Sequence, residues 1–263
     1  MSGDFFLLAE QLAREARVVW VGGFAVFLRI GAAVALFPAF GEQIVPLRVR
    51  LMAALCFTLV VAPAVMPQVA AVARVPADLP HLFATEVVSG LALGMVFRLM
   101  VMALQVAGTM AAQSTSLAQF FGGAGVDPQP AISQLLVMAG LALAAMAGLH
   151  IRLAEALVES YALLPPGMFA PAAALAEWGV GEVASAFALA FRLAMPFVIA
   201  ALIYNVALGA INRAMPQLMV AFVGAPALTW GGLALLFAVV PVALVLWWQA
   251  FERLLVAPFG VPG

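Results

Sequence analysis

Six long apolar stretches constrain the fold of this chain more than any other feature of its sequence. A helix needs about 20 apolar residues to cross a hydrocarbon core about 30 Å thick, and each stretch reaches or approaches that length. The stretches run over residues 18–37, 51–73, 82–111, 132–149, 183–211 and 222–250. Backbone groups in lipid have to be satisfied within their own segment, so the stretches predict helices. We therefore expect an all-α integral membrane protein.

The composition excludes most other classes of protein. Hydrophobic residues make up 67% of the 263 residues and charged residues only 9%, whereas a soluble domain carries about 25% charged residues. The net charge of -1 gives no attraction for nucleic acid. Cys56 is the single cysteine, which excludes an intrachain disulfide and a cysteine-based metal cluster.

Proline interrupts three of the six stretches. Pro63 and Pro67 lie in the second stretch, Pro196 in the fifth and Pro241 in the sixth. Proline removes a backbone donor and its ring clashes with the preceding turn, so it kinks a helix or splits it into a hairpin. A simple bundle of six helices is therefore the weaker picture, and we expect several stretches to be divided into helical hairpins.

The first 17 residues carry a different pattern. Acidic residues stand where a secretory signal has its basic region, and no small-residue cleavage site follows, so this segment is not read as a cleavable signal. Apolar residues recur at helical spacing; they are Phe5, Leu8, Leu12 and Ala16. The pattern predicts a short amphipathic lead-in helix over residues 1–17. It would enter the first stretch of a single polytopic membrane domain over residues 1–263.

Arginines inside the apolar stretches mark polar contacts. Arg29, Arg98 and Arg192 each lie well within a stretch. Placing an arginine at the middle of a membrane costs about 2.5–3.5 kcal/mol on insertion scales. Each of these side chains is therefore expected to have a polar partner or water.

The spacing Glu86-x3-Gly90-x3-Gly94 places a carboxylate and two glycines on one face of a helix. Small residues at this spacing let two helices approach closely. The favoured interpretation is close helix packing at Gly90 and Gly94, with Glu86 paired to an arginine. A role for Glu86 in a proton relay is the alternative.

No set of catalytic or metal-binding residues converges in the sequence. The segment GAGVD at 123–127 has one residue too many for the signature of intramembrane aspartyl proteases, and no stretch holds a second Asp. His150 and Glu155 lie about 140° apart around a helix, so they do not face one ion together. Glu155 and Glu159 share a face beside Arg152, which favours an ion-paired helix end. We therefore predict a protein that is not an enzyme and has no metal or other cofactor.

Three blocks of residues resemble one known family. The first block holds FLRIG at 27–31, FPAFG at 37–41 and VPLRVR at 45–50. The middle block joins the Glu86, Gly90 and Gly94 spacing to Ala107-Gly108, Gln113 and Asp127-Pro128. The last block holds AMP at 194–196, Asn205, Leu208-Gly209, Arg213, Pro216-Gln217 and Gly224-x-Pro226. Over residues 20–245 the chain resembles the FliR family, the R (or T) subunit of the flagellar and type III secretion export gate.

The resemblance implies a non-enzymatic part in protein export. In this family one R subunit closes a helical ring with P and Q subunits, and unfolded exported proteins pass through its centre. An FlhB-type switch subunit is a further partner. The resemblance therefore implies helical hairpins packed in a hetero-oligomeric gate, in the bacterial inner membrane at the flagellar basal body. The polar residues expected to make ion pairs or subunit contacts are Arg29, Glu86, Arg98, Arg192 and Arg213.

The resemblance also implies a plug loop at residues 114–130. Two phenylalanines there suit a narrow apolar constriction that excludes ions by dewetting, and three glycines give the backbone freedom to swing aside. The residues expected to form the plug are Gln119, Phe120, Phe121, Gly122, Gly123, Gly125 and Asp127. The alternative is an ordinary interhelical loop whose phenylalanines contact lipid.

Two other functions remain open at this point. The first is the T subunit of a type III secretion injectisome, which shares the family. The second is a small secondary transporter, in which the prolines mark discontinuous helices and the buried arginines hold an anionic substrate.

Overall fold

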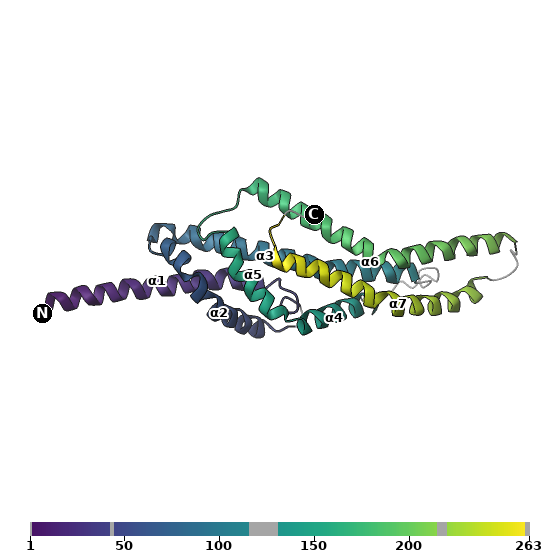
Figure 1. The fold of residues 1–263 in the computed structure, drawn as a ribbon, viewed down its shortest axis with the longest axis horizontal. Helices are drawn as coiled ribbons and strands as arrows, with labels where there is room; N and C mark the ends of the chain where they lie inside the picture. The colour runs from purple at the N-terminus through teal and green to yellow at the C-terminus, as the bar shows by residue number, and fades with distance from the viewer. Residues whose placement is uncertain (1, 43–44, 116–130, 215–219, 261–263) are drawn as a thin grey trace. The chain divides into compact units, whose positions relative to one another are not determined.

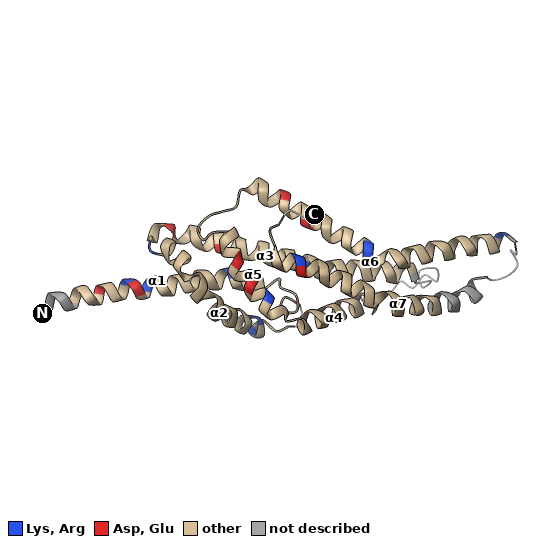
Figure 2. Ribbon diagram, in the orientation of Figure 1, with Lys and Arg blue, Asp and Glu red and all other residues tan. Residues whose placement is uncertain are grey.

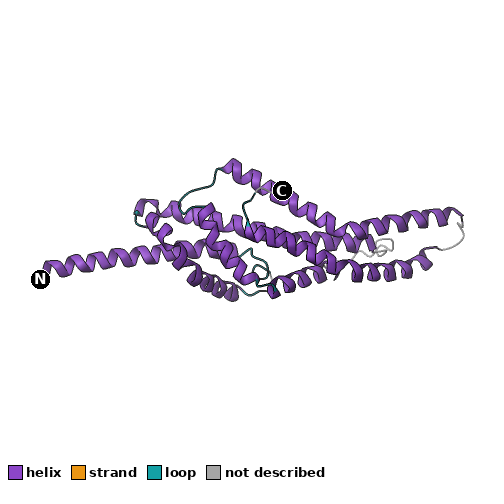
Figure 3. Ribbon diagram, viewed as in Figure 1, coloured by secondary structure: helices purple, strands orange, loops and turns teal. Residues whose placement is uncertain are grey.

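The computed structural model describes residues 2–42, 45–115, 131–214 and 220–260, and within these residues the chain is helical with no strand. Figure 1 shows the helices and Figure 3 shows how little of the described chain lies outside them. The elements are α1 (Ser2–Val34), α2 (Leu47–Ala73), the short 3-10 helix η1 (Pro76–Asp78), α3 (Leu79–Thr115), α4 (Ala131–Met146), α5 (Leu149–Leu163), α6 (Ala172–Ala214) and α7 (Val220–Val256).

The prediction of an all-α membrane protein is confirmed. Five of the described helices are long and apolar enough to cross a membrane, and α4 with α5 adds a sixth if that bent pair is one span. Figure 2 shows how few charged residues these helices carry, with none along α4.

The prolines do not divide the helices, which corrects the prediction of hairpins at these positions. α2 continues through Pro63 and Pro67, and α6 continues through Pro196. α7 likewise continues through Pro241. Proline removes one backbone hydrogen bond from a helix, and neighbouring residues can satisfy the freed carbonyl in a membrane protein. The chain breaks instead between α4 and α5, where Gly148 has a left-handed φ of 80° that favours glycine.

The first helix is longer than the sequence indicates. The predicted lead-in over residues 1–17 and the first apolar stretch form one continuous helix, α1. Its 33 residues correspond to a length of about 50 Å. Every described side chain from residue 6 to residue 17 is exposed, and burial begins at Val18.

The described chain groups into two compact units. The first unit comprises residues 1–98, 148–181 and 253–263. Within it α1 packs against α2, and α2 also packs against α5. Val26 and Ile30 of α1 and Val61 of α2 are completely buried there.

The second unit comprises residues 99–147 and 182–252, so it holds the later part of α3, all of α4 and most of α6 and α7. Trp247 of α7 is completely buried in this unit. Its indole Nε1 donates a hydrogen bond to the carbonyl oxygen of Met100 in α3 at 2.8 Å. The large aromatic side chain therefore ties α7 to α3 with both apolar contact and a satisfied polar atom.

Candidate functional site

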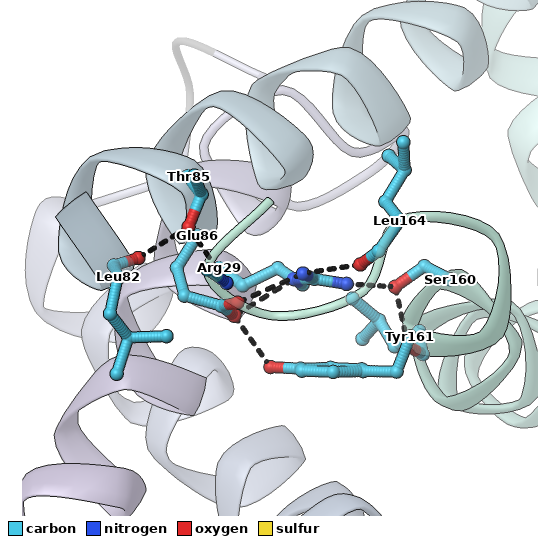
Figure 4. Close-up of polar contacts among 9 residues, drawn as sticks. Arg29, Leu82, Thr85, Glu86, Ser160, Tyr161 and Leu164 are labelled. Carbon is cyan, nitrogen blue, oxygen red and sulfur yellow. Dashed lines mark hydrogen bonds and ion pairs between the residues drawn. The ribbon is translucent and has the colours of Figure 1, made fainter. Parts of the chain in front are cut away.

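Arg29 lies near the carboxyl-terminal end of α1, on the helix face that is buried inside the first unit. Val26, Ile30 and Ala33 share this face and are completely buried, as is Arg29 itself. A buried guanidinium has lost its water and therefore requires polar partners in the protein. Figure 4 shows that these partners come from α3 and α5.

Glu86 of α3 pairs with Arg29 through two parallel hydrogen bonds. Arg29 Nε donates to Glu86 Oε2 at 2.9 Å, and Arg29 Nη2 donates to Glu86 Oε1 at 2.9 Å. Both side chains are 0% exposed. This fork-to-fork geometry is the strongest form of a charge-assisted hydrogen bond, and the prediction that Glu86 pairs with an arginine is confirmed.

α5 closes the site from another direction. Arg29 Nη1 donates to Ser160 Oγ at 3.2 Å, and Arg29 Nη2 also donates to the carbonyl oxygen of Leu164 at 2.8 Å. The Tyr161 ring lies beneath the guanidinium, with its centroid 3.7 Å from Arg29 Cζ. The Tyr161 hydroxyl donates to Glu86 Oε2 at 2.8 Å. We call Arg29, Glu86, Ser160, Tyr161 and the Leu164 carbonyl the polar network.

Two glycines of α3 permit this geometry. A Cβ atom added at Gly90 would lie 2.1 Å from the carbonyl oxygen of Arg29, and one at Gly94 would lie 2.8 Å from that of Ala33. The contacted atoms belong to the backbone of α1, so no side chain can rotate out of the way. The two helices therefore make the close approach that the spacing of Glu86, Gly90 and Gly94 predicts.

The connector between α5 and α6 is fastened beside the network. The backbone N–H of Gly167 donates to Thr85 Oγ1 at 3.2 Å, and Thr85 Oγ1 donates to the Leu82 carbonyl at 2.8 Å. Gly167 has a φ of 73°, and a Cβ there would lie 3.0 Å from Val72 Cγ1. His81 and Phe169 add an edge-to-face contact with ring centroids 5.0 Å apart.

The polar network is closed to solvent, and its charged groups are hydrogen-bonded within the chain. Both charges are paired, and the Arg29 donors Nε, Nη1 and Nη2 each have an acceptor within the chain. Removing one partner of a buried ion pair typically costs about 3–5 kcal/mol, because the other charge is left uncompensated. The arrangement can hold α1, α3 and α5 in fixed positions relative to one another.

The other predicted arginines lie in different surroundings. Arg98 of α3 forms an ion pair with Glu42, with side chains 24% and 23% exposed. Arg50 of α2 donates to the Glu42 carbonyl at 2.6 Å. Glu42, in the link between α1 and α2, therefore contacts both α2 and α3. Arg192 and Arg213 of α6 are exposed, and neither has a polar partner within the described part of the chain.

α5 carries the ion-paired surface that the sequence predicts. Arg152 and Glu155 form an exposed salt bridge at 3.6 Å. Among the described residues, no group of three His, Cys, Asp or Glu side chains is placed to hold a metal ion.

The predicted plug residues lie outside the described residues. This applies to Gln119, Phe120, Phe121, Gly122, Gly123, Gly125 and Asp127. Of the predicted loop at 114–130, only Ser114 and Thr115 are described, and both belong to the last turn of α3.

Sequence reasoning missed the contribution of α5 to the network. Tyr161 is one of only two tyrosines in the chain. It follows Leu153 and Leu157 at intervals of four residues, and all three are buried. This periodicity was the available signal, because an aromatic hydroxyl on a buried helix face needs a polar partner.

Comparison with known proteins gives a consistent match. A family model described as bacterial export proteins, family 1, matches residues 20–254. The flagellar biosynthetic protein FliR of Caulobacter vibrioides is 33% identical over 232 residues, which cover 88% of this chain and 92% of that protein. FliR of Escherichia coli is 28% identical over 243 residues, covering 88% and 89%. FliR of Aquifex aeolicus is 27% identical over 221 residues, covering 83% and 85%.

Proposed function

The chain belongs to the FliR family of bacterial export proteins, and from this membership we propose that it is a subunit of the membrane gate of a flagellar type III export apparatus. The observation that carries the proposal is the family match, which spans residues 20–254. The three relatives are each described as flagellar biosynthetic proteins. Their names favour the flagellar system over an injectisome.

The length of the helices supports a place among partner proteins. α6 has 43 residues, a contour length of about 65 Å. At a tilt of 40°, the upper end of the range seen for membrane helices, about 26 residues cross a 30 Å core. The remaining residues of α6 extend beyond the hydrocarbon.

Apolar side chains continue along much of this helix. Phe187 is 52% exposed, Leu202 is 63% exposed and Ile211 is 46% exposed. An apolar surface longer than the hydrocarbon core is best covered by other protein chains. The covering chains in this proposal are the P and Q subunits of the gate, with an FlhB-type subunit beside them.

The polar residues divide into internal and external groups in this proposal. Arg29 and Glu86 fix the fold of the subunit, because their polar atoms are engaged within the chain. Arg192 and Arg213 are exposed on the apolar surface of α6, and we assign them to contacts with acidic or carbonyl groups of neighbouring subunits. The subunit has no catalytic task and acts through assembly.

The segment at residues 114–130 is proposed to close the gate. Phe120 and Phe121 would fill an apolar constriction, and a passing unfolded protein would push them aside. The proposal rests on the family resemblance and on the composition of this segment. It places the protein in the bacterial inner membrane at the flagellar basal body.

Secretion measurements test the proposed function. A strain without this gene should fail to secrete flagellar proteins and to swim, and a plasmid copy should restore both. Normal secretion in the deletion strain would contradict the proposal. The purified chain should also be unstable alone and stable with P and Q subunits, whereas a transporter would be stable alone or as a homo-oligomer.

A leak measurement tests the plug. Deleting residues 114–125 should let small ions or dyes pass through the assembled gate at rest. An unchanged leak in gates that assemble normally would favour the ordinary interhelical loop.

A further inference from the structure

α2 carries its charges only at its two ends. Arg48 and Arg50 lie in its first turn, Arg74 directly follows it, and residues 51–73 hold no charged side chain. As a helix, residues 51–73 extend over about 35 Å, close to the thickness of a hydrocarbon core of about 30 Å. α2 is also long and apolar enough to cross a membrane. Its arginines therefore lie at the levels where a membrane has its headgroups.

The arginine at the carboxyl-terminal end of α2 is compensated within the chain. Arg74 Nη2 lies 3.7 Å from Glu15 Oε2 of α1 in an exposed ion pair. At the amino-terminal end, Arg48 is exposed and has no polar partner within the described residues. The two ends of the same helix therefore differ in whether their positive charge is paired.

Arg50 also lacks a carboxylate partner within the described residues. Its Nη2 donates to the backbone carbonyl of Glu42, whose carboxylate is ion-paired with Arg98. The first turn of α2 holds no acidic residue, and the residue before it, Pro46, provides no side-chain cap. The amino-terminal end of a helix carries a partial positive charge, which disfavours cations there. The positive charge at this end would therefore be stabilised by an anion from outside the chain.

An exposed apolar face continues from Arg48 toward the middle of α2. Its members follow Arg48 at helical spacing and share one side of the helix with it; they are Leu51, Met52, Leu55 and Leu59. Their side chains are 49%, 60%, 41% and 77% exposed, in that order. The residues that α2 buries lie on a different side of the helix. We call Arg48 and these four residues the Arg48 face.

We propose that the Arg48 face binds an anionic phospholipid of the membrane. The Arg48 guanidinium donates to the lipid phosphate, a group that arginine recognises well, and the acyl chains lie along the four apolar side chains. The levels of the two parts agree, because the unpaired cation stands at the edge of the uncharged segment and the apolar side chains lie within it. This inference goes beyond the proposed function and does not depend on which proteins the gate exports.

A lipid fits this face better than a soluble phosphate compound. A soluble anion would pair with the arginine but leave the four apolar side chains uncovered. A phospholipid joins a charged group to acyl chains in one molecule, so it covers both parts of the face. Anionic lipids attract a basic residue near the membrane surface by about 1 kcal/mol, which is roughly a fivefold preference over a lipid without net charge.

Cys56 provides a probe on the same side of the helix. It is the single cysteine of the chain and it is exposed. It follows Arg48 by eight residues, about 12 Å along the helix. A fluorophore attached to Cys56 reports which lipid lies beside the Arg48 face, because bromine atoms on an acyl chain quench a fluorophore only at short range.

The test uses the labelled full-length chain, purified with cysteine-free versions of the subunits that accompany it and placed in phosphatidylcholine vesicles. An increasing fraction of the lipid is replaced by brominated phosphatidylglycerol in one series and by brominated phosphatidylcholine in the other. We expect phosphatidylglycerol to reach half-maximal quenching at roughly one fifth of the fraction that phosphatidylcholine requires. Inorganic phosphate added to the buffer should not reduce this difference.

Three variants connect the preference to Arg48. Arg48→Gln should remove the fivefold preference, and Arg48→Lys should keep most of it because the charge remains. Arg74→Gln is the matched control, since it removes one positive charge from the opposite end of the same helix. It should leave the preference at the wild-type value.

Equal quenching by the two lipids in the wild-type chain would overturn the proposal. Absence of quenching by either lipid would also overturn it, because the face would then be covered by a neighbouring subunit. Competition by inorganic phosphate would identify a site for soluble anions instead of lipid. Equal losses in Arg48→Gln and Arg74→Gln would show that the preference follows the total charge of the chain, which contradicts a site at Arg48.

Discussion

The polar network of the first unit and the contact between α3 and α4 in the second unit both use glycines for close approach, but they differ in the polar groups that join the helices. The network joins α1, α3 and α5 with a completely buried ion pair and a tyrosine. α3 and α4 are joined by the close contacts of Gly108 and Gly140 and by a hydrogen bond from the Ser133 hydroxyl to the Gln105 carbonyl at 3.0 Å. A buried charge pair makes a few specific contacts, and removal of one partner leaves the other buried without a polar partner. Small-residue packing lets the two backbones approach closely, and its contribution is spread over many weak contacts.

The difference bears on how each region responds to substitution. A buried ion pair that loses one partner leaves an uncompensated charge, whereas a single neutral hydrogen bond contributes only about 0.5–1.5 kcal/mol. The variants below test this comparison, beginning with the largest expected effect.

Removing the carboxylate of the network should have the largest effect. Glu86→Ala leaves the Arg29 guanidinium buried without its counter-charge, and we expect a loss of about 3–5 kcal/mol in the free energy of unfolding. The Arg29→Met/Glu86→Met double variant should recover most of this loss, since a buried pair replaced by apolar side chains is often neutral. Denaturation of the purified complex measures both. A double variant no more stable than Glu86→Ala would mean that the network does more than balance its own charges.

The tyrosine hydroxyl should contribute less. Tyr161→Phe keeps the ring beneath Arg29 and removes only the hydrogen bond to Glu86, so we expect a loss of about 1.5–3 kcal/mol, the range for hydrogen bonds to charged groups. The same denaturation experiment measures it. A loss within error of zero would show that the carboxylate is satisfied without Tyr161.

A methyl group added at a glycine distinguishes contacts with backbone from contacts with a side chain. Gly90→Ala forces a Cβ against the Arg29 carbonyl, where the backbone has to move, and we expect a cost of about 1–3 kcal/mol from overpacking. Gly140→Ala meets the end of the Leu104 side chain, which can rotate, so its cost should be smaller. Equal losses in the two variants would contradict the distinction between backbone and side-chain contact.

The smallest expected effect concerns the second unit. Trp247→Phe removes the hydrogen bond from the indole to the Met100 carbonyl and keeps an aromatic ring, so we expect a loss of about 0.5–1.5 kcal/mol. Tyr161→Phe is the matched variant in the first unit. Because Phe is also smaller than Trp, a loss well above this range would show that the packing of the indole, and not its hydrogen bond, dominates at Trp247.

The sequence predicted some of these features because they are local. Hydropathy identifies the helices, and the spacing of Glu86, Gly90 and Gly94 identifies a packed face with a charge that needs a partner. The need of Arg29 for a polar partner can also be predicted locally, since an ionised group inside an apolar stretch is costly.

Other features depend on which helices meet, and no local pattern specifies that. Tyr161 belongs to α5 and Leu164 directly follows that helix. Both are distant in the sequence from Arg29 and Glu86, so their part in the network became visible only in the fold. The continuation of α2 through Pro63 and Pro67 likewise depends on neighbours that compensate a lost hydrogen bond. The plug residues remain predictions.

One measurement tests the role of the polar network most directly: the yield of subunit assembled with its P and Q partners, for Glu86→Ala and for the Arg29→Met/Glu86→Met double variant in parallel. The account predicts that Glu86→Ala lowers the yield and that the double variant recovers most of it. A wild-type yield with Glu86→Ala, or a double variant that assembles no better than Glu86→Ala, would contradict it.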